Sequence, residues 1–232
     1  MLDDVSSEAI GAVVAEMDRV RAGLPRRDGI GVFIDVYRQV TALVAERVTD
    51  GTFADHAFVE DLDVRFARIF LDVPRNLAAG RPVSKAWQPL VDRRVTRGVL
   101  PIQLALAGMN AHINHDLALA LVATCRARRR EPESGSIHAD FEKVNAVLAE
   151  VVRPIRRSFL DEAVIRYGAG ASPLVDLVSN FSIDKARDAA WVSGLTLWHL
   201  RGVPFVPAAV RDSLARTVGL VSRQLLTVVE LD

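Results

Sequence analysis

The sequence predicts an all-α fold, with about seven to eight helices packed as one domain over residues 1–232 around a buried central helix at about 101–130. Three observations support this fold class. Apolar residues recur three and four positions apart along most of the chain, whereas the two-residue alternation typical of strands is rare. Proline and glycine separate these periodic segments from one another. The segment 101–122 is apolar on nearly every side, as expected of a helix enclosed by others.

Three long helices are expected in the first third of the chain. The first covers about 9–24 and is capped at the serine pair that begins with Ser6. The second and third cover about 29–49 and 54–79, and Pro74 favours a kink in the third. Their apolar stripes consist of Phe33, Val36, Tyr37, Val40 and Val44 in the second helix, and Phe58, Leu62, Phe66, Ile69, Phe70 and Val73 in the third.

The rest of the chain is expected to form one short helix and four longer ones. A turn with the sequence GRPVSKAWQPL leads into the short helix, and the central helix follows from Pro101 to the basic run RARRR. Helices at about 138–167, 184–200 and 207–229 complete the domain. Pro154 favours a bend in the first of these three.

Charge and composition exclude several functions. Lys plus Arg and Asp plus Glu each total 29, so the chain has no basic excess with which to neutralise a nucleic-acid backbone. The single cysteine, Cys125, excludes an internal disulfide framework, and the acidic start MLDDVSSEAI lacks the layout of a secretory signal. We therefore expect a cytoplasmic protein that binds no nucleic acid. Apolar helix faces are compatible with a homodimer, although no heptad run defines a coiled-coil seam.

Five strongly polar residues interrupt the apolar segment. They are Asn110, His112, Asn114, His115 and Asp116. Because a bilayer core tolerates few such groups, they argue against a membrane span. On a regular helix, Asn110 and Asn114 share one face, whereas His112 and Asp116 share a nearly opposite face with His115 beside them. No side of this helix is wholly polar, so the five groups are expected to be buried or to line an internal cavity, where each needs a partner.

The pair His112 and Asp116 is spaced for catalysis or for metal binding. Four residues apart on a helix, Asp116 can orient the imidazole of His112, which then acts as a general acid or base near neutral pH. His115 can join this catalytic group, while Asn110 and Asn114 bind substrate or stabilise negative charge. Alternatively, His112, His115 and Asp116 hold a divalent metal ion that activates water. With only five histidines in the chain, the version without a cofactor is favoured.

Other helices offer further candidates. Asn145 falls at the edge of an apolar stripe in the helix at 138–167 and is expected to join the substrate-binding residues. Trp191 is a second such candidate, because it shares a face of the next helix with Arg187 and Trp198, where a cation can lie over an indole. Core packing is the commoner role of such a tryptophan. Asp63 lies at the margin of the apolar stripe of its helix and is interpreted as a boundary residue.

These observations predict an enzyme that acts on a small apolar organic molecule by general acid-base chemistry in a mostly apolar pocket. Cyclisation, isomerisation and hydrolysis all fit such a site. Two other classes stay open. The protein is a metal-dependent hydrolase if the three candidate ligands hold an ion, and it is a ligand-binding or structural protein if the polar cluster only orients a ligand or specifies packing.

The polar segment also carries a family resemblance. The stretches VYRQVTALV, FVEDLDVRFARIF, GMNAHINHDL and DFEKVNAVL resemble those of a bacterial family of unknown function. The resemblance marks Asn110, His112, Asn114, Asp116 and Asn145 as motif positions and implies no activity. The His-x-x-x-Asp spacing is also similar to that of the all-helical, zinc-dependent phospholipase C and single-strand nuclease group, where such residues bind zinc. The other ligands of that group, including an N-terminal tryptophan, are missing from this chain.

Overall fold

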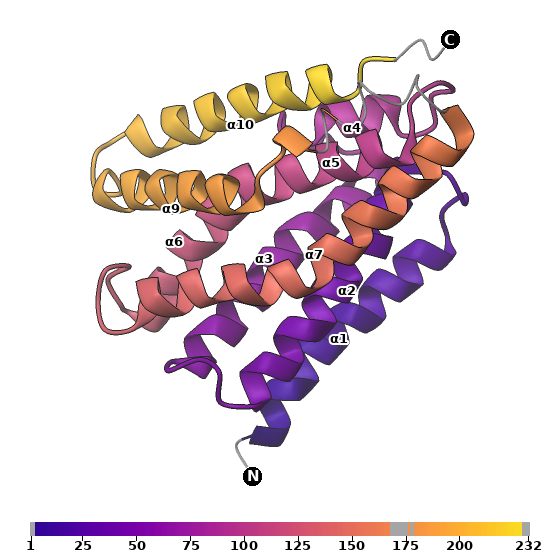
Figure 1. The fold of residues 1–232 in the computed structure, drawn as a ribbon. Coiled ribbons are helices and arrows are strands. Elements are labelled where there is room, and N and C mark those ends of the chain that lie inside the picture. The colour runs from indigo at the N-terminus through magenta and orange to yellow at the C-terminus, as the bar shows by residue number, and fades with distance from the viewer. Residues whose placement is uncertain (1–2, 168–175, 177–178, 229–232) are drawn as a thin grey trace.

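A computed structural model describes residues 3–167, 176 and 179–228, and every regular element within them is helical (Figure 1). The all-α fold class predicted from the periodicity is therefore confirmed. The helices are α1 Asp3–Ala22, α2 Gly29–Thr49, α3 His56–Ala78, α4 Gln88–Arg93, α5 Pro101–Ala111, α6 Leu117–Arg128, α7 Ile137–Tyr167, α9 Ile183–His199 and α10 Val206–Leu225, and one wide turn, η1 His112–Asp116, joins α5 to α6.

The chain from α5 through η1 to α6 lies between two groups of helices. In Figure 1, α1, α2 and α3 lie on one side of it, while α9 and α10 lie on the other. α2 and α10 pack against α5, whereas α3 and α9 pack against α6. Residues 102–113 are buried without interruption. This burial is what a segment that is apolar on nearly every side requires, because it has no face to present to water.

The prediction of one continuous central helix is wrong in one respect, because a π-helical turn interrupts the helix at the polar cluster. The backbone N–H of Leu117 donates to the carbonyl of His112, five residues back instead of four. Periodicity could not reveal this turn. A change in the number of residues per turn is visible only as a shift of the apolar face, and a segment that is apolar on all sides has no such face. Turns of this kind occur frequently at functional sites. Here the turn holds four of the five polar residues that the sequence singled out, all except Asn110.

Two helix boundaries also differ from expectation. α1 begins at Asp3, about a turn before the predicted serine cap, since a capping preference is worth only about 1 kcal/mol and does not stop a helix from extending. α3 continues through Pro74 to Ala78 without a break in its assignment. The lost hydrogen bond at a proline is tolerated where tertiary packing holds the helix on both sides, as Leu71 and Val73 do here from the core.

A close approach of α2 to α5 sets the position of the apolar stripe of α2. A Cβ atom added at Gly108 would lie 2.5 Å from Cδ2 of Phe33, so the backbone of α5 and this aromatic ring touch directly. The ring of Phe33 in turn contacts those of Tyr37, Phe70 and Trp87. The stripes predicted as core in α2 and α3 therefore converge on the start of η1.

The absence of a membrane span was predicted from the polar residues of segment 101–122. None of the helices in the described part of the chain is long and apolar enough to cross a bilayer. Within the segment, Asn110, His112 and Asp116 are at most 3% exposed. Protein groups therefore surround these polar side chains, as their burial was expected to require.

Candidate functional site

The carboxylate of Asp116 is the centre of the buried polar cluster. It is fully buried and lies 3.2 Å from Nδ1 of His112 and 2.7 Å from Nδ1 of His115. The indole N–H of Trp87 donates a third hydrogen bond of 2.9 Å. Burial alone raises the pKa of Asp116, but the bonds and charges of both imidazoles outweigh it and hold this pKa below its ordinary value. Asp116 is therefore an ionised acceptor shared by two histidines.

This arrangement fixes the tautomer of His112. A carboxylate only accepts hydrogen bonds, so Nδ1 of His112 carries the proton and Nε2 carries a lone pair. Nε2 is shielded from solvent and has no hydrogen-bond partner among the described residues. Burial lowers the pKa of His112, and the neighbouring Asp116 offsets only part of that effect. Near neutral pH the ring is thus a neutral base with its basic nitrogen free.

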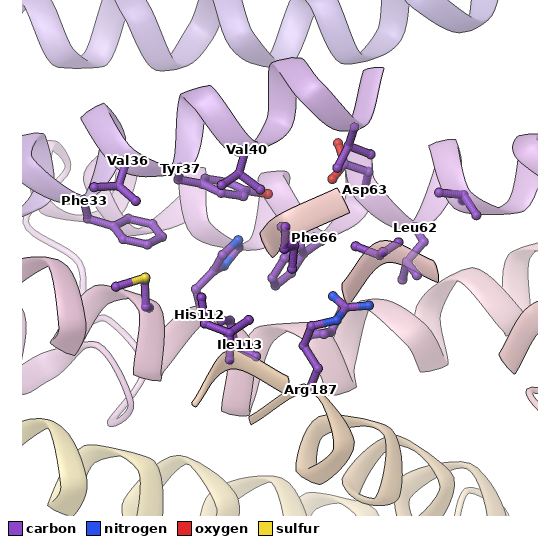
Figure 2. A pocket seen from close by; sticks show the side chains of 17 residues that line it. Phe33, Val36, Tyr37, Val40, Leu62, Asp63, Phe66, His112, Ile113 and Arg187 are labelled. Carbon is purple, nitrogen blue, oxygen red and sulfur yellow. The ribbon is translucent and has the colours of Figure 1, made fainter. Parts of the chain in front are cut away.

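His112 forms part of the wall of a mostly apolar pocket of about 80 Å³ (Figure 2). Its ring lies flat on that of Phe66, with centroids 3.5 Å apart and planes 5° apart, and edge-on to Tyr37 at 4.3 Å. The remaining wall comes from α2 and α3, from α5, η1 and α6, and from α7 and α9. Its apolar members are Phe33, Val36, Val40, Val44, Val59, Leu62, Met109, Ile113, Leu117, Val144, Leu148 and Ile183.

Two other polar groups of the lining also lack partners. Oδ2 of Asp63 and the hydroxyl of Tyr37 are both shielded from solvent, with no hydrogen-bond partner among the described residues. Burial raises the pKa of Asp63 to about 7, against a smaller opposing effect of Arg187. Burial, and then the charge of Asp63, raises the pKa of Tyr37 well above its ordinary value. Near neutral pH, Tyr37 is a hydrogen-bond donor and Asp63 is about half protonated.

The fourth polar member of the lining is Arg187 from α9. It is 4% exposed, its Nε donates to Oδ1 of Asn145, and its Nη2 donates to the carbonyl of Phe141 at 2.7 Å. Its guanidinium lies 4.3 Å above the ring of Phe141. Burial lowers the pKa of Arg187 to about 10, so the side chain remains a cation at neutral pH. Figure 2 shows this cation and the carboxyl of Asp63 on opposite sides of the pocket.

Two of the predicted site residues lie away from this pocket, against α10. The side-chain amide of Asn110 donates to the carbonyl of Val218 at 3.0 Å and to the hydroxyl of Ser222 at 2.9 Å. Asn114 donates to Oδ1 of Asn110 at 3.2 Å. The predicted division of the cluster into two faces is therefore observed, and the asparagine face joins helices. Neither asparagine belongs to the pocket lining. Their role in substrate binding stays a prediction.

The other predicted residues have positioning contacts. His115 is held by Asp116 and lies 3.4 Å from the hydroxyl of Ser84 through its Nε2. Asn145 holds Arg187 and donates to Glu142, so it reaches the pocket only through the arginine. Neither residue belongs to the pocket lining.

Trp191 also lies outside the pocket lining. It packs on the rings of His138 and Phe141. The expected cation over an indole forms elsewhere, because Arg187 lies over Phe141 and it is Arg201 that lies over Trp198, at 4.0 Å. The helix face of Trp191 was identified correctly, but its aromatic partners come from α7.

The candidate metal ligands do not share an open coordination position. Both imidazoles direct Nδ1 at Asp116, while Nε2 of His112 is shielded without a partner among the described residues and Nε2 of His115 lies beside Ser84. Within the described ranges, no group of three or more His, Cys, Asp or Glu side chains is arranged to hold a metal ion. Binding an ion through these residues would require the carboxylate to exchange its present hydrogen bonds for metal coordination.

Sequence reasoning missed three residues of this site. Tyr37 was included only as a core residue, Asp63 as a boundary residue and Arg187 only as a neighbour of tryptophans. A signal was present for each, since all three are polar groups on or beside apolar helix faces. What pattern analysis lacked was the relative rotation of α2, α3 and α9, which brings the three faces to one cavity.

These features define an all-helical protein with a buried polar cluster beside a small, mostly apolar pocket. The chain belongs to the family of unknown function DUF5995, whose sequence model matches residues 10–228. This agrees with the resemblance to a family of unknown function noted in the sequence. No curated protein and no solved structure matches the chain. The likeness to zinc-dependent phospholipases and nucleases stays a prediction.

Proposed function

We propose that this protein is an enzyme that binds a small, mostly apolar molecule in this pocket and transfers a proton to or from it through His112. One observation carries the proposal. Of the four shielded side-chain polar atoms without a hydrogen bond in the described structure, three belong to residues of this single cavity: Tyr37, Asp63 and His112. Each such atom costs about 1–3 kcal/mol when left unpaired, so native proteins pair them with water or ligand.

The chemistry proposed for His112 follows from its two nitrogens. Nε2 accepts a proton from a ligand in the pocket, and the resulting imidazolium is stabilised by Asp116, which also keeps Nδ1 protonated. Asp63 and Tyr37 supply protons on the same cavity wall, because their raised pKa values keep protons on them near neutral pH. A neutral base and a protonated carboxyl in one apolar pocket are what isomerisation by proton transfer requires.

Hydrogen exchange into the ligand tests the proposal without knowledge of the product. Small carbonyl compounds that bind the pocket would be incubated with the protein in D₂O, and their C–H signals would be followed by proton NMR. We expect accelerated exchange with wild type and background exchange with His112→Asn. This variant retains a donor to Asp116 near the position of Nδ1 and lacks Nε2. His199→Asn, outside the pocket, is the matched control.

The same experiment separates enzyme from binding protein. If compounds bind the pocket saturably but wild type and His112→Asn give the same exchange rates, the pocket holds a ligand without chemistry, which is the second function that this lining supports.

Metal-dependent hydrolysis remains the alternative derived from the sequence. It predicts a stoichiometric divalent ion in protein purified without a metal-affinity tag, lost in His112→Ala.

A further inference from the structure

Arg187 is a buried cation whose hydrogen bonds go to uncharged oxygens. Its acceptors are the side-chain amide of Asn145 and the backbone carbonyl of Phe141. Acidic groups act on it only through their charge, and in the described part of the chain no ion pair or hydrogen bond joins its guanidinium to a carboxylate. Burying a cation without an anionic partner costs free energy. The pocket wall therefore holds a positive charge that an anion in the cavity would compensate.

Asp63 faces this cation across the pocket and also lacks a partner. Its Oδ2 is shielded and accepts no hydrogen bond from a described residue. A carboxyl group at this position carries a proton about half of the time at pH 7. When protonated, it is a donor aimed into the same cavity that Arg187 lines.

We propose that the pocket binds a short-chain monocarboxylic acid as its carboxylate, between the guanidinium of Arg187 and the carboxyl of Asp63, with the alkyl chain against the aliphatic wall. This inference rests on the proposed function, because it takes the same pocket as the ligand site. It adds the chemical class of the ligand and its orientation.

Charge decides among the ligand classes. A neutral ligand would leave Arg187 without an anionic hydrogen-bond partner, and an ammonium ligand would place a second positive charge beside it. A carboxylate neutralises the arginine, and its remaining lone pairs accept from protonated Asp63. Size sets the chain length, because the cavity of about 80 Å³ is smaller than the roughly 150 Å³ cavity that admits benzene. A carboxylate with a short alkyl chain is therefore favoured over one with a long chain.

Binding of this ligand takes up a proton at Asp63, so the apparent affinity falls as pH rises. With a pKa of about 7, the protonated fraction of Asp63 drops roughly tenfold between pH 6 and pH 8. Burial lowers the pKa of His112 and raises that of Tyr37, so it opposes the charged form of both groups. The acidic groups whose charge acts on Arg187 from the surrounding helices are Glu142 on α7 and Asp184 and Asp188 on α9, and Asp116 on η1 acts on Tyr37.

NMR titration with three four-carbon probes tests the inference. Butyrate, 1-butanol and butylammonium would be added to full-length protein with labelled valine and isoleucine methyl groups, at pH 6 and pH 8. We expect butyrate to shift the methyl signals of Val36, Val40 and Ile113 saturably, at least tenfold more tightly than the alcohol or the amine. Its affinity should fall up to about tenfold from pH 6 to pH 8.

Two variants assign the effect to the proposed residues. Arg187→Met should weaken butyrate at least tenfold and leave 1-butanol unchanged, whereas Arg201→Met, which removes a cation over Trp198 outside the pocket, should change neither. Asp63→Asn keeps a donor that does not titrate, so butyrate should bind equally at both pH values. This second variant decides the matter if Arg187→Met does not fold.

The outcomes distinguish the two proposals. Equal affinity for 1-butanol and butyrate, or a pH-dependence that persists in Asp63→Asn, would overturn the carboxylate inference and leave the pocket as a ligand site. If none of the three probes shifts the pocket methyl groups, both the carboxylate inference and the proposed function are overturned.

Discussion

The imidazole of His112 and the ring of Phe66 lie face to face, with centroids 3.5 Å apart and planes 5° apart. Phe66 thereby covers one face of the imidazole, while Asp116 holds one of its edges at Nδ1. The opposite edge, with Nε2, is shielded from solvent and has no hydrogen-bond partner among the described residues. The low basicity of His112 therefore depends on an aromatic ring from a helix that precedes it by more than forty positions in the chain.

Removing that ring should restore basicity to His112. In Phe66→Ala water enters beside the imidazole, so we expect the pKa of His112 to rise toward 6.5 and the protein to lose about 3–5 kcal/mol of stability. NMR titration of the imidazole and urea unfolding measure the two effects. Phe58→Ala, on the same helix but outside the pocket, should cost similar stability without moving the pKa of His112. A His112 pKa that shifts equally in both variants would contradict the role of Phe66.

Because two histidines and Trp87 share the carboxylate of Asp116, we expect replacement of this one side chain to lower the stability of the protein strongly. Asp116→Asn replaces a group that accepts three hydrogen bonds with one that has a single acceptor oxygen, so at least one imidazole loses its partner. We expect a loss of about 3 kcal/mol in urea unfolding and a changed tautomer of His112 in nitrogen-15 NMR. Asp140→Asn alters a similarly buried carboxylate that accepts from Ala54 and Asp55. It should lower stability with the tautomer of His112 unchanged.

Asp63 makes stability depend on pH with a sign opposite to that of most carboxyl groups. Its folded-state pKa is raised to about 7, so the native state holds a proton that the unfolded chain releases near pH 4. Stability from this group is therefore present at low pH and is lost as pH rises through 7. Asp63→Asn, which never ionises, should stabilise the protein by about 1–3 kcal/mol at pH 8 and by less at pH 5. Equal gains at both pH values, measured by urea unfolding, would show that Asp63 is solvated.

The contact between α5 and Phe33 predicts that Gly108 cannot carry a side chain. Gly108→Ala places a methyl group 2.5 Å from that ring, which we expect to cost about 1–3 kcal/mol and to disturb the pocket wall. Gly11→Ala on α1 meets nothing within 4 Å and should instead gain about 0.5–1 kcal/mol from helix propensity. Thermal unfolding of the two variants should therefore shift in opposite directions. A neutral effect at Gly108 would mean that α2 can move away from α5.

The sequence alone sufficed for the fold class and for the location of the polar cluster. Periodicity at three and four positions is a local property, so the helices and their apolar stripes could be identified from it. The cluster from Asn110 to Asp116 could be located because polar groups in a segment without a polar face must be buried. The pairing of His112 with Asp116 followed from their spacing, and it is present in the structure.

Only the tertiary structure decided which of those residues share a cavity. Asp63 and Arg187 lie more than a hundred positions apart, and their meeting across the pocket depends on how α3 and α9 are rotated about their axes. The asparagines, by contrast, turn toward α10, because the carbonyl of Val218 and the hydroxyl of Ser222 are within reach there. The sequence determines which side chains must be buried, because burial follows from local pattern and solvation. Helix packing sets which partners these side chains contact, because contacts between distant segments produce no repeating pattern in a single sequence.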